Sequence, residues 1–427
     1  MGGGKIIGLE LSDEYCQISY YDEEKNEPET LEIAIDNYQI PLMLGYYNDQ
    51  WVYGKEAKRL HTVNEDYVAV DLYSKAVRHE KVKINDRQFD GVWLLAKYLQ
   101  LALVQFQEID HITFSVPYKD IDISKLLKGI GQFIGIPKEN VYVQDYKESF
   151  CHYMFYQPKE LWQYESALFY CDRNEIRAYM LRRVKTVIGR GNDLFVTVDE
   201  VARAQMKELA AIYPVLNVDK AKDADERFRS FIQGVFDKKV VSSVFLIGEG
   251  FENNWYPNSL KVLCNGRRAF LGNNLYSKGA CYASYRKGRD FEDSPVYLDQ
   301  SKMMEQVCLK MRVRGKECWY PIVEWGTHWY EADGQWEVLL EDTSDIEIHI
   351  ESLASGELQA ETVSLAGLPE RKDYALRLQI KTMFIDDTTC KVIFKDAGFG
   401  EFFPATDFQV EKVIHLGGSN GQFNSLS

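Results

Sequence analysis

The stretch Val241–Arg286, VSSVFLIGEGFENNWYPNSLKVLCNGRRAFLGNNLYSKGACYASYR, decides the fold because several elements follow one another in it. Its apolar run Val244–Ile247 has the length of a buried strand. Gly248-Glu249-Gly250 comes next, and two glycines after a strand permit a tight turn and a close approach of a ligand to the backbone. The remaining elements are expected to be a helix at 258–264, a strand at 267–270 and a helix at 275–283.

The last of these helices is rich in small residues. Gly279, Ala280 and Ala283 would allow it to pack very close to a sheet. A structural turn in any α/β protein is the alternative interpretation of the glycine pair, so the argument rests on the order of all the elements.

That order resembles the adenosine-binding segment of the actin, sugar kinase and heat-shock-seventy superfamily. In that superfamily a strand ends in a glycine loop against the nucleotide, and a later helix carries a small-residue core. The resemblance implies that Gly248, Gly250, Phe251 and Lys278 lie at a nucleotide site.

Composition bounds the other possibilities. The 427 residues suffice for two or three domains, and 45% hydrophobic residues supply sizeable cores. A formal net charge of −15 argues against general affinity for nucleic acids or anionic membranes. The sequence contains neither an apolar run of membrane-spanning length nor a signal-peptide core, so we expect a cytoplasmic protein.

Cysteine and histidine patterns point the same way. The eight cysteines form no CxxC pair and mostly have apolar neighbours, which favours buried, reduced thiols in the cytosol. The seven histidines are scattered, so no zinc site is predicted.

A hairpin is expected at the start of the chain, with strands at Lys5–Glu10 and Tyr15–Tyr21 around the turn Ser12-Asp13-Glu14. It occupies the position of the first phosphate hairpin of the actin-like superfamily. The resemblance implies that Gly8 and Ser12 lie near phosphate and that Glu10 holds magnesium. Glu10, Ser12 and Asp13 replace the usual Asp, Gly and Thr. An ordinary edge hairpin remains the alternative.

A second hairpin is expected around Ala167–Glu175, where a second lobe would open. Its Asp172 matches the superfamily's acid and is, with Glu10, the second implied magnesium ligand. Asn174 stands at the glycine position and tolerates positive φ, and Glu175 follows. We expect the two hairpins to face each other across a cleft with Gly248 and Gly250 at its base.

Between the hairpins, the pattern predicts a further strand–helix–strand unit. We expect strands at 31–35, 112–117 and 141–143 and helices at 89–107 and 124–134 there, and helices at 198–213 and 223–235 after the second hairpin. Asp145 and Glu148 stand where active relatives carry an acid that orients water. Their alternative role is to cap the helix that runs to Tyr156.

After Asp290 short alternating strands dominate. They are expected at 305–313, 318–323, 336–340, 346–350, 375–380 and 390–394. Trp325, Trp329 and Trp336 suit either a sandwich core or a binding face.

The predicted fold is therefore a two-lobed α/β actin-like module of ribonuclease-H-like repeats followed by an all-β sandwich-like domain. The lobes are expected at 5–165 and 166–292, the β-domain at 295–416, and a disordered tail at 417–427. A protease is expected to cut between Arg286 and Asp299. Several phrases, among them 157–162, 248–255, 264–268 and 272–282, are similar to an uncharacterised bacterial family with an actin-like ATPase-type module.

The expected function depends on where this sequence differs from the active members of the superfamily. Asp13, Glu175 and Glu249 replace residues that are neutral in active relatives. A carboxylate about 4 Å from a phosphate charge costs about 4 kcal/mol at an effective dielectric constant of about 20. Glu10 and Asp172 with magnesium, or an inward Arg173, would offset part of this.

We therefore expect a degenerate scaffold that binds ATP or ADP with magnesium weakly or not at all. It would act through a protein or peptide partner on the β-domain. The alternatives are an active chaperone-like ATPase or kinase of the superfamily, and an unrelated α/β enzyme with an appended sandwich.

Overall fold

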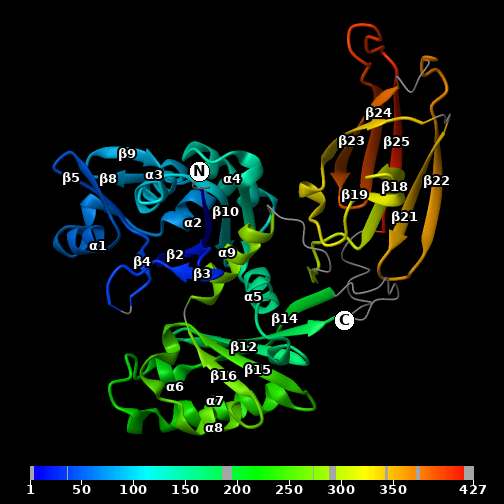
Figure 1. The fold of residues 1–427 in the computed structure, drawn as a ribbon. Helices are drawn as coiled ribbons and strands as arrows, with labels where there is room; N and C mark the ends of the chain where they lie inside the picture. The colour runs from blue at the N-terminus through cyan, green and yellow to red at the C-terminus, as the bar shows by residue number, and fades with distance from the viewer. Residues whose placement is uncertain are drawn as a thin grey trace. The chain divides into compact units, whose positions relative to one another are not determined.

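The computed structural model describes residues 4–35, 37–184, 195–272, 274–287, 295–341, 345–371 and 376–417. The chain divides into two compact units (Figure 1). Unit 1 comprises Met1–Arg182 and Val198–Glu292, and unit 2 comprises Arg183–Thr197 and Asp293–Ser427. The expected tail, apart from Gly417, and the centre of the expected protease-sensitive segment lie outside the described residues.

The first sheet of unit 1 has the strand order β11-β10-β1-β2-β3. The strands β1, β10 and β11 run parallel, whereas β2 is antiparallel to β1 and β3 to β2. Their bounds are β1 (Lys5–Leu11), β2 (Tyr15–Asp22), β3 (Glu27–Thr30), β10 (Ile109–Val116) and β11 (Val141–Asp145). β1 is almost fully buried, as expected for an apolar strand covered on both faces.

The second sheet repeats this order as β16-β15-β12-β13-β14. The strands β12, β15 and β16 run parallel, and β13 is antiparallel to β12. The bounds are β12 (Glu165–Cys171), β13 (Glu175–Arg183), β14 (Phe195–Gln205), β15 (Val241–Ile247) and β16 (Arg268–Leu271). Each sheet thus begins with a hairpin and ends with two parallel strands on the other side of its first strand.

Helices precede or follow the parallel strands of the two sheets. They are α3 (Gly91–Ala102), α4 (Ile121–Phe133), α5 (Tyr146–Phe155), α7 (Lys222–Phe236), α8 (Pro257–Leu263) and α9 (Leu275–Lys287). The carboxylates of Asp90, Asp120 and Asp145 accept backbone N–H groups at the starts of α3, α4 and α5. For Asp145 the capping interpretation is therefore confirmed.

Smaller elements fill the chain between β3 and α3 and after β14. They are β4 (Ile40–Pro41), β5 (Leu44–Tyr47), β6 (Gln50–Tyr53), α1 (Gly54–Val63), β7 (Val68–Ala69), α2 (Leu72–Val77), β8 (Lys81–Ile84), β9 (Arg87–Asp90) and α6 (Lys207–Ala210).

The helix α9 packs on the first sheet, against β1, β2 and β10 (Figure 1). A side chain at Gly8 of β1 would overlap the α9 backbone at Ser277 and Cys281, so the glycine is what admits the helix. α9 also meets α5 closely, because a side chain at Gly279 would overlap the carbonyl oxygen of Ser149. The small-residue pattern thus serves both a helix-on-sheet and a helix-on-helix contact.

Three sequence predictions in unit 1 are wrong. The segment 31–35 is not a strand, and β3 lies just before it. The segment 198–213 is not one helix, because β14 extends to Gln205 and only α6 is helical. In β14 exposed and half-buried positions alternate from Val201 to Gln205 as the strand period requires, and this signal was read as helical. α4 begins at Ile121 rather than Ser124 because Asp120 caps it.

Unit 2 is an all-antiparallel β region of two four-stranded sheets, β19-β18-β21-β22 and β20-β23-β24-β25. The bounds are β18 (Glu305–Val313), β19 (Lys316–Val323), β20 (Gly334–Leu339), β21 (Asp345–Ser352), β22 (Leu358–Ser364), β23 (Arg377–Asp386), β24 (Thr389–Asp396) and β25 (Gln409–His415). The short β17 (Val296–Tyr297) pairs with Phe195 and Val196. One hydrophobic cluster takes residues from both four-stranded sheets.

The six strands predicted in this region are confirmed, whereas β22 and β25 were missed because most of their residues are exposed. Trp329 and Trp336 pack against the shared cluster, and the ring of Trp325 lies 5.9 Å from that of Phe195. Within the described residues, no helix is long and apolar enough to span a membrane.

Candidate functional site

A cavity of about 490 Å³ opens in unit 1 at the carboxyl ends of strands from both sheets. Ser12 follows β1, Pro117 follows β10, Tyr146 follows β11, Asp172 follows β12 and Gly248 follows β15. In open α/β sheets, ligands bind at the carboxyl ends of the strands. The other lining residues are Glu14, Tyr15, Gln39, Lys147, Phe150, Leu168, Tyr170, Arg177, Tyr179, Val198, Glu200, Glu249 and Tyr276.

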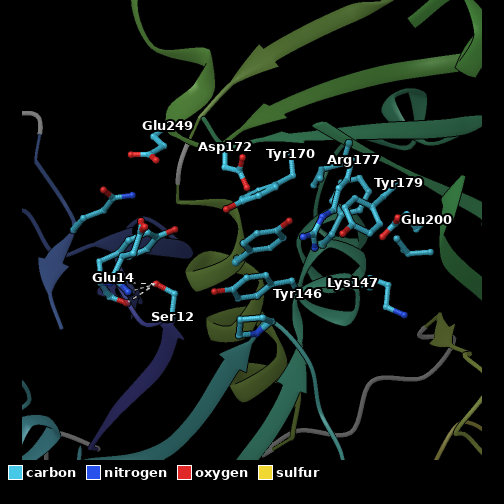
Figure 2. A pocket seen from close by; sticks show the side chains of 18 residues that line it. Ser12, Glu14, Tyr146, Lys147, Tyr170, Asp172, Arg177, Tyr179, Glu200 and Glu249 are labelled. Atoms are coloured by element: carbon cyan, nitrogen blue, oxygen red, sulfur yellow. Dashed lines mark hydrogen bonds between the residues drawn. The ribbon is translucent and has the colours of Figure 1, made fainter. Parts of the chain in front are cut away.

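Tyrosines form much of the wall. The rings of Tyr146, from α5, and Tyr276, from α9, stack with centroids 4.3 Å apart and an angle of 6° between their planes. Burial raises the pKa of both hydroxyls and that of Tyr170, so all three are neutral phenols. Figure 2 shows Tyr146 and Tyr170 across the cavity from Ser12 and Glu14.

The cavity wall carries the carboxylates of Glu14, Asp172, Glu200 and Glu249 and the cations of Lys147 and Arg177. The guanidinium of Arg177 contacts the carboxylate of Glu175, and the amine of Lys147 lies 3.7 Å from the Asp145 carboxylate. Both cations are therefore already neutralised by acids outside the cavity.

Two of the wall carboxylates also have cationic partners. Arg173 donates two hydrogen bonds to Glu249, of 2.8 and 3.1 Å. Arg203 binds Glu200 in the same two-pronged way, at 2.8 and 3.0 Å. Such two-pronged pairs fix the orientation of a carboxylate, but at an exposed site they add little to the free energy of folding.

Glu14 and Asp172 differ from these. Burial raises the pKa of Glu14, the charges of Glu249 and Asp172 raise it further, and Arg173 lowers it. Within the described part of the chain no side chain forms a hydrogen bond or ion pair with the Glu14 carboxylate. The Asp172 carboxylate accepts only backbone N–H groups there, those of Asn174 at 2.6 Å and Glu175 at 2.8 Å.

The two hairpin turns use their own side chains to bind their own backbone. The hydroxyl of Ser12 accepts the N–H groups of Glu14 and Tyr15 at 3.3 and 3.1 Å. Asp172 does the same for Asn174 and Glu175. These Ser and Asp turns hold the amide donors that a phosphate-binding loop would present to a ligand.

Of the predicted site residues, Ser12, Asp172 and Gly248 line the cavity, and so does Glu249. Glu10 does not line it. The Glu10 side chain is 1% exposed, and its Oε1 accepts a 2.7 Å hydrogen bond from the hydroxyl of Tyr15. Burial raises the pKa of Glu10 to about 8, and hydrogen bonds from Tyr15 and the Ser277 backbone lower it in part.

The other predicted residues have structural roles away from the cavity lining. Gly8 admits α9, and a side chain at Gly250 would overlap Asp172 and Cys171. Phe251 is buried in the core of the second sheet. Asn174 is exposed and accepts the N–H of Met206 through its carbonyl, while Lys278 is half-buried on α9. The expected cleft therefore has Ser12, Asp172 and Gly248 around it, but neither Glu10 nor Gly250.

Two of the three acids expected to repel phosphate are engaged elsewhere. Asp13 accepts the backbone N–H of Ser74 at 2.8 Å and also binds its hydroxyl, which ties the first hairpin to α2. Glu175 binds Arg177. Asp13 and Glu175 are thus bound to Ser74 and Arg177, and of the three acids Glu249 lines the cavity.

Sequence reasoning missed Glu14, Glu200 and the tyrosines. Glu14 lies in the turn that was singled out, so its position alone was a signal. Glu200 was missed because its segment was read as a helix. Tyr146 and Asp172 share one usable signal, since each directly follows a strand, β11 or β12. Within the described residues no three His, Cys, Asp or Glu side chains come together as a metal site.

Two family models match the chain. The model described as Family of unknown function (DUF5716) C-terminal matches residues 27–300. The model described as Domain of unknown function (DUF8552) matches residues 302–416. No curated protein matches the sequence significantly.

Proposed function

We propose that this chain, which belongs to the family of unknown function DUF5716, is a degenerate actin- or heat-shock-seventy-like scaffold. In this proposal unit 1 binds nucleotides weakly or not at all and does not hydrolyse ATP. The protein acts instead through a partner that binds unit 2.

The fold part of the proposal is supported by the repeated strand order. Both sheets of unit 1 place a hairpin first and add two parallel strands beside its first strand. The cavity opens where the carboxyl ends of β1, β10, β12 and β15 converge. A duplicated sheet with a ligand cavity between its halves is the arrangement that the superfamily resemblance implies.

The observation that carries the functional part is the state of the two hairpin turns. A phosphate cradle needs backbone N–H groups that are free to donate. Here Ser12 and Asp172 occupy the donors of Glu14, Tyr15, Asn174 and Glu175. A phosphate would have to displace those bonds and also approach the charge of Asp172.

Charge adds to this cost. Within the wall, Glu14 and Asp172 have no cationic side chain bound to them among the described residues. Each unit of phosphate charge about 4 Å from such a carboxylate costs about 4 kcal/mol at an effective dielectric constant of about 20. The phosphates of ATP are therefore the part of the molecule that the cavity disfavours.

The partner part of the proposal is supported by a groove of about 930 Å³ in unit 2. Residues of β18 to β21 line it, including Val338, Trp336 and the exposed Leu339. β20 and β19 are the edge strands of their sheets. Edge strands offer unpaired backbone groups, so an extended peptide segment is the partner chemistry that fits.

Calorimetric titration of the full chain with adenosine, ADP and ATP, each with magnesium, tests the nucleotide part. We expect affinity to fall with each added phosphate and ATP to produce no saturable heat at millimolar concentration. Micromolar affinity for magnesium-ATP, tighter than for adenosine, would contradict the proposal and favour an active ATPase or kinase.

A further inference from the structure

We infer that the cavity of unit 1 takes a small organic cation with a flat, uncharged body, such as an aromatic amine or amidine. This inference rests on the proposed function in one respect, namely that the cavity is not an ATP site. It goes beyond the proposal because it names the class of ligand.

The size and lining of the cavity fit a small molecule. Its volume of about 490 Å³ lies in the range of small-molecule sites. Aromatic and aliphatic side chains make up much of the wall, with Tyr146, Tyr276, Phe150 and Leu168 among them. A flat ligand can therefore bury most of its surface against rings.

Tyr276 brings a polar group to the wall. Its side chain is 4% exposed, and its hydroxyl makes no hydrogen bond within the described residues. Because Tyr276 lines the cavity, a ligand atom there can accept a hydrogen bond from this hydroxyl.

The sign of the ligand charge follows from the wall. Lys147 and Arg177 lie beside acids outside the lining, whereas Glu14 and Asp172 bind no cationic side chain in the described ranges. Figure 2 shows the carboxylates of Glu14, Asp172 and Glu249 around one end of the cavity. A cation placed there would meet negative charge on several sides.

The aromatic wall favours the same sign. Tyrosine rings attract cations through their negative faces, and this attraction grows when water is excluded. An ammonium or amidinium group near Glu14 and Asp172 would therefore gain from both carboxylates and rings, whereas an anion would gain from neither. The flat body would then lie toward the Tyr146 and Tyr276 stack.

Three probes of one shape and different charge test the inference. Benzamidine is cationic, benzamide is neutral and benzoate is anionic. Binding of each to the full chain is measured by ligand-observed NMR and calorimetry. We expect benzamidine to bind at least about tenfold more tightly than benzamide, since one ion pair at a partly buried site is worth about this much. Benzoate should not bind.

Two variants locate the site. Glu14→Gln should weaken benzamidine about tenfold without weakening benzamide, because it removes one carboxylate charge from the cavity wall and keeps the shape. Tyr276→Phe should weaken the binding of benzamidine and of benzamide about fivefold each, because it removes one hydrogen-bonding group from the cavity wall. Glu139→Gln, an exposed change outside the cavity lining, is the charge-matched control and should change nothing.

The outcomes separate this inference from the proposed function. Absence of benzamidine binding, equal binding of all three probes, or insensitivity to Glu14→Gln would overturn the inference and leave the scaffold proposal standing. Competition of benzamidine by micromolar magnesium-ATP would overturn both.

Discussion

The hydroxyl of Tyr15 donates a 2.7 Å hydrogen bond to Oε1 of the buried Glu10, and Tyr15 itself lines the cavity of unit 1. The backbone N–H of Ser277, on α9, donates to the same carboxyl. Glu10 therefore connects the first hairpin to a helix that lies some 270 residues later in the chain. This buried acid thus has a structural role, because it holds Tyr15 of the cavity wall and the start of α9 together.

Glu10 predicts a pH dependence of stability. Its pKa is raised by burial from 4.5 to about 8 in the folded protein, so the folded state holds the proton more tightly than the unfolded state. The stability that results is fully present below about 4.5 and is lost as the pH rises through about 8. Glu10→Gln should flatten the free energy of unfolding across this range, as measured by urea denaturation at several pH values.

Glu139→Gln is the control for that series, because Glu139 is exposed and lies in a short 3-10 helix. If the Glu10→Gln protein keeps the pH dependence of the wild type, Glu10 is not the titrating group.

The contact between α5 and α9 predicts opposite effects for two glycine substitutions. Gly279→Ala would place a methyl group onto the carbonyl oxygen of Ser149, a backbone atom that cannot move alone. We expect a loss of about 1–3 kcal/mol in the free energy of unfolding. Gly234→Ala, on α7, meets nothing within 4 Å and should gain about 0.5–1 kcal/mol. A stable Gly279→Ala protein would contradict the close packing of the two helices.

Unit 2 contains a buried ion pair with its own signature. Arg371 donates hydrogen bonds of 2.9 and 2.7 Å to Asp396, and their side chains are 6% and 0% exposed. Burial raises the pKa of Asp396, but hydrogen bonds from Arg371, Gly398 and Thr406 outweigh it and hold the pKa well below its usual range. The stability from this group is present above the usual pKa of Asp and is lost as the pH falls.

Asp396→Asn should therefore lower the free energy of unfolding of unit 2 by about 3–5 kcal/mol at neutral pH, because it leaves a buried guanidinium uncompensated. Glu361→Gln, which breaks the more exposed pair with Lys412, should cost only about 0–1 kcal/mol. Equal losses in the free energy of unfolding from the two substitutions would show that the buried Arg371–Asp396 pair contributes no more to stability than the exposed pair.

The hairpin turns predict a gain of function. Ser12→Gly frees the N–H groups of Glu14 and Tyr15, and Asp172→Gly frees those of Asn174 and Glu175 and removes a charge. The double variant should bind magnesium-ATP at least about tenfold more tightly than the wild type. Asp13→Thr with Glu175→Gly should give no such gain, because those acids bind Ser74 and Arg177. Calorimetry on both variants would distinguish the two cases.

The elements that could be predicted from the sequence are those whose pattern of buried residues lies within one short stretch of the chain. β15, α8 and α9 follow one another with clear apolar runs, a glycine turn and a small-residue helix, and all three were placed correctly. β14 was misread because its Val and Ala residues fit a helical period as well as a strand.

The roles of the site residues were harder to predict from the sequence, because they depend on contacts between residues far apart in the chain. The role of Gly8 is set by the α9 backbone, and the burial of Glu10 is set in part by Ser277. The engagement of Asp13 depends on Ser74, about sixty positions along the chain. None of these partners has a spacing that a motif could reveal, so the sequence located the two hairpin turns but not the contacts of their side chains.

The central claim is that the cavity does not support ATP chemistry, and phosphate release by the full chain tests it most directly. With magnesium-ATP at millimolar concentration, we predict release indistinguishable from that of the heat-denatured protein, in the wild type and in Glu14→Gln alike. Saturable release in the wild type that is abolished by Asp172→Asn would contradict the claim.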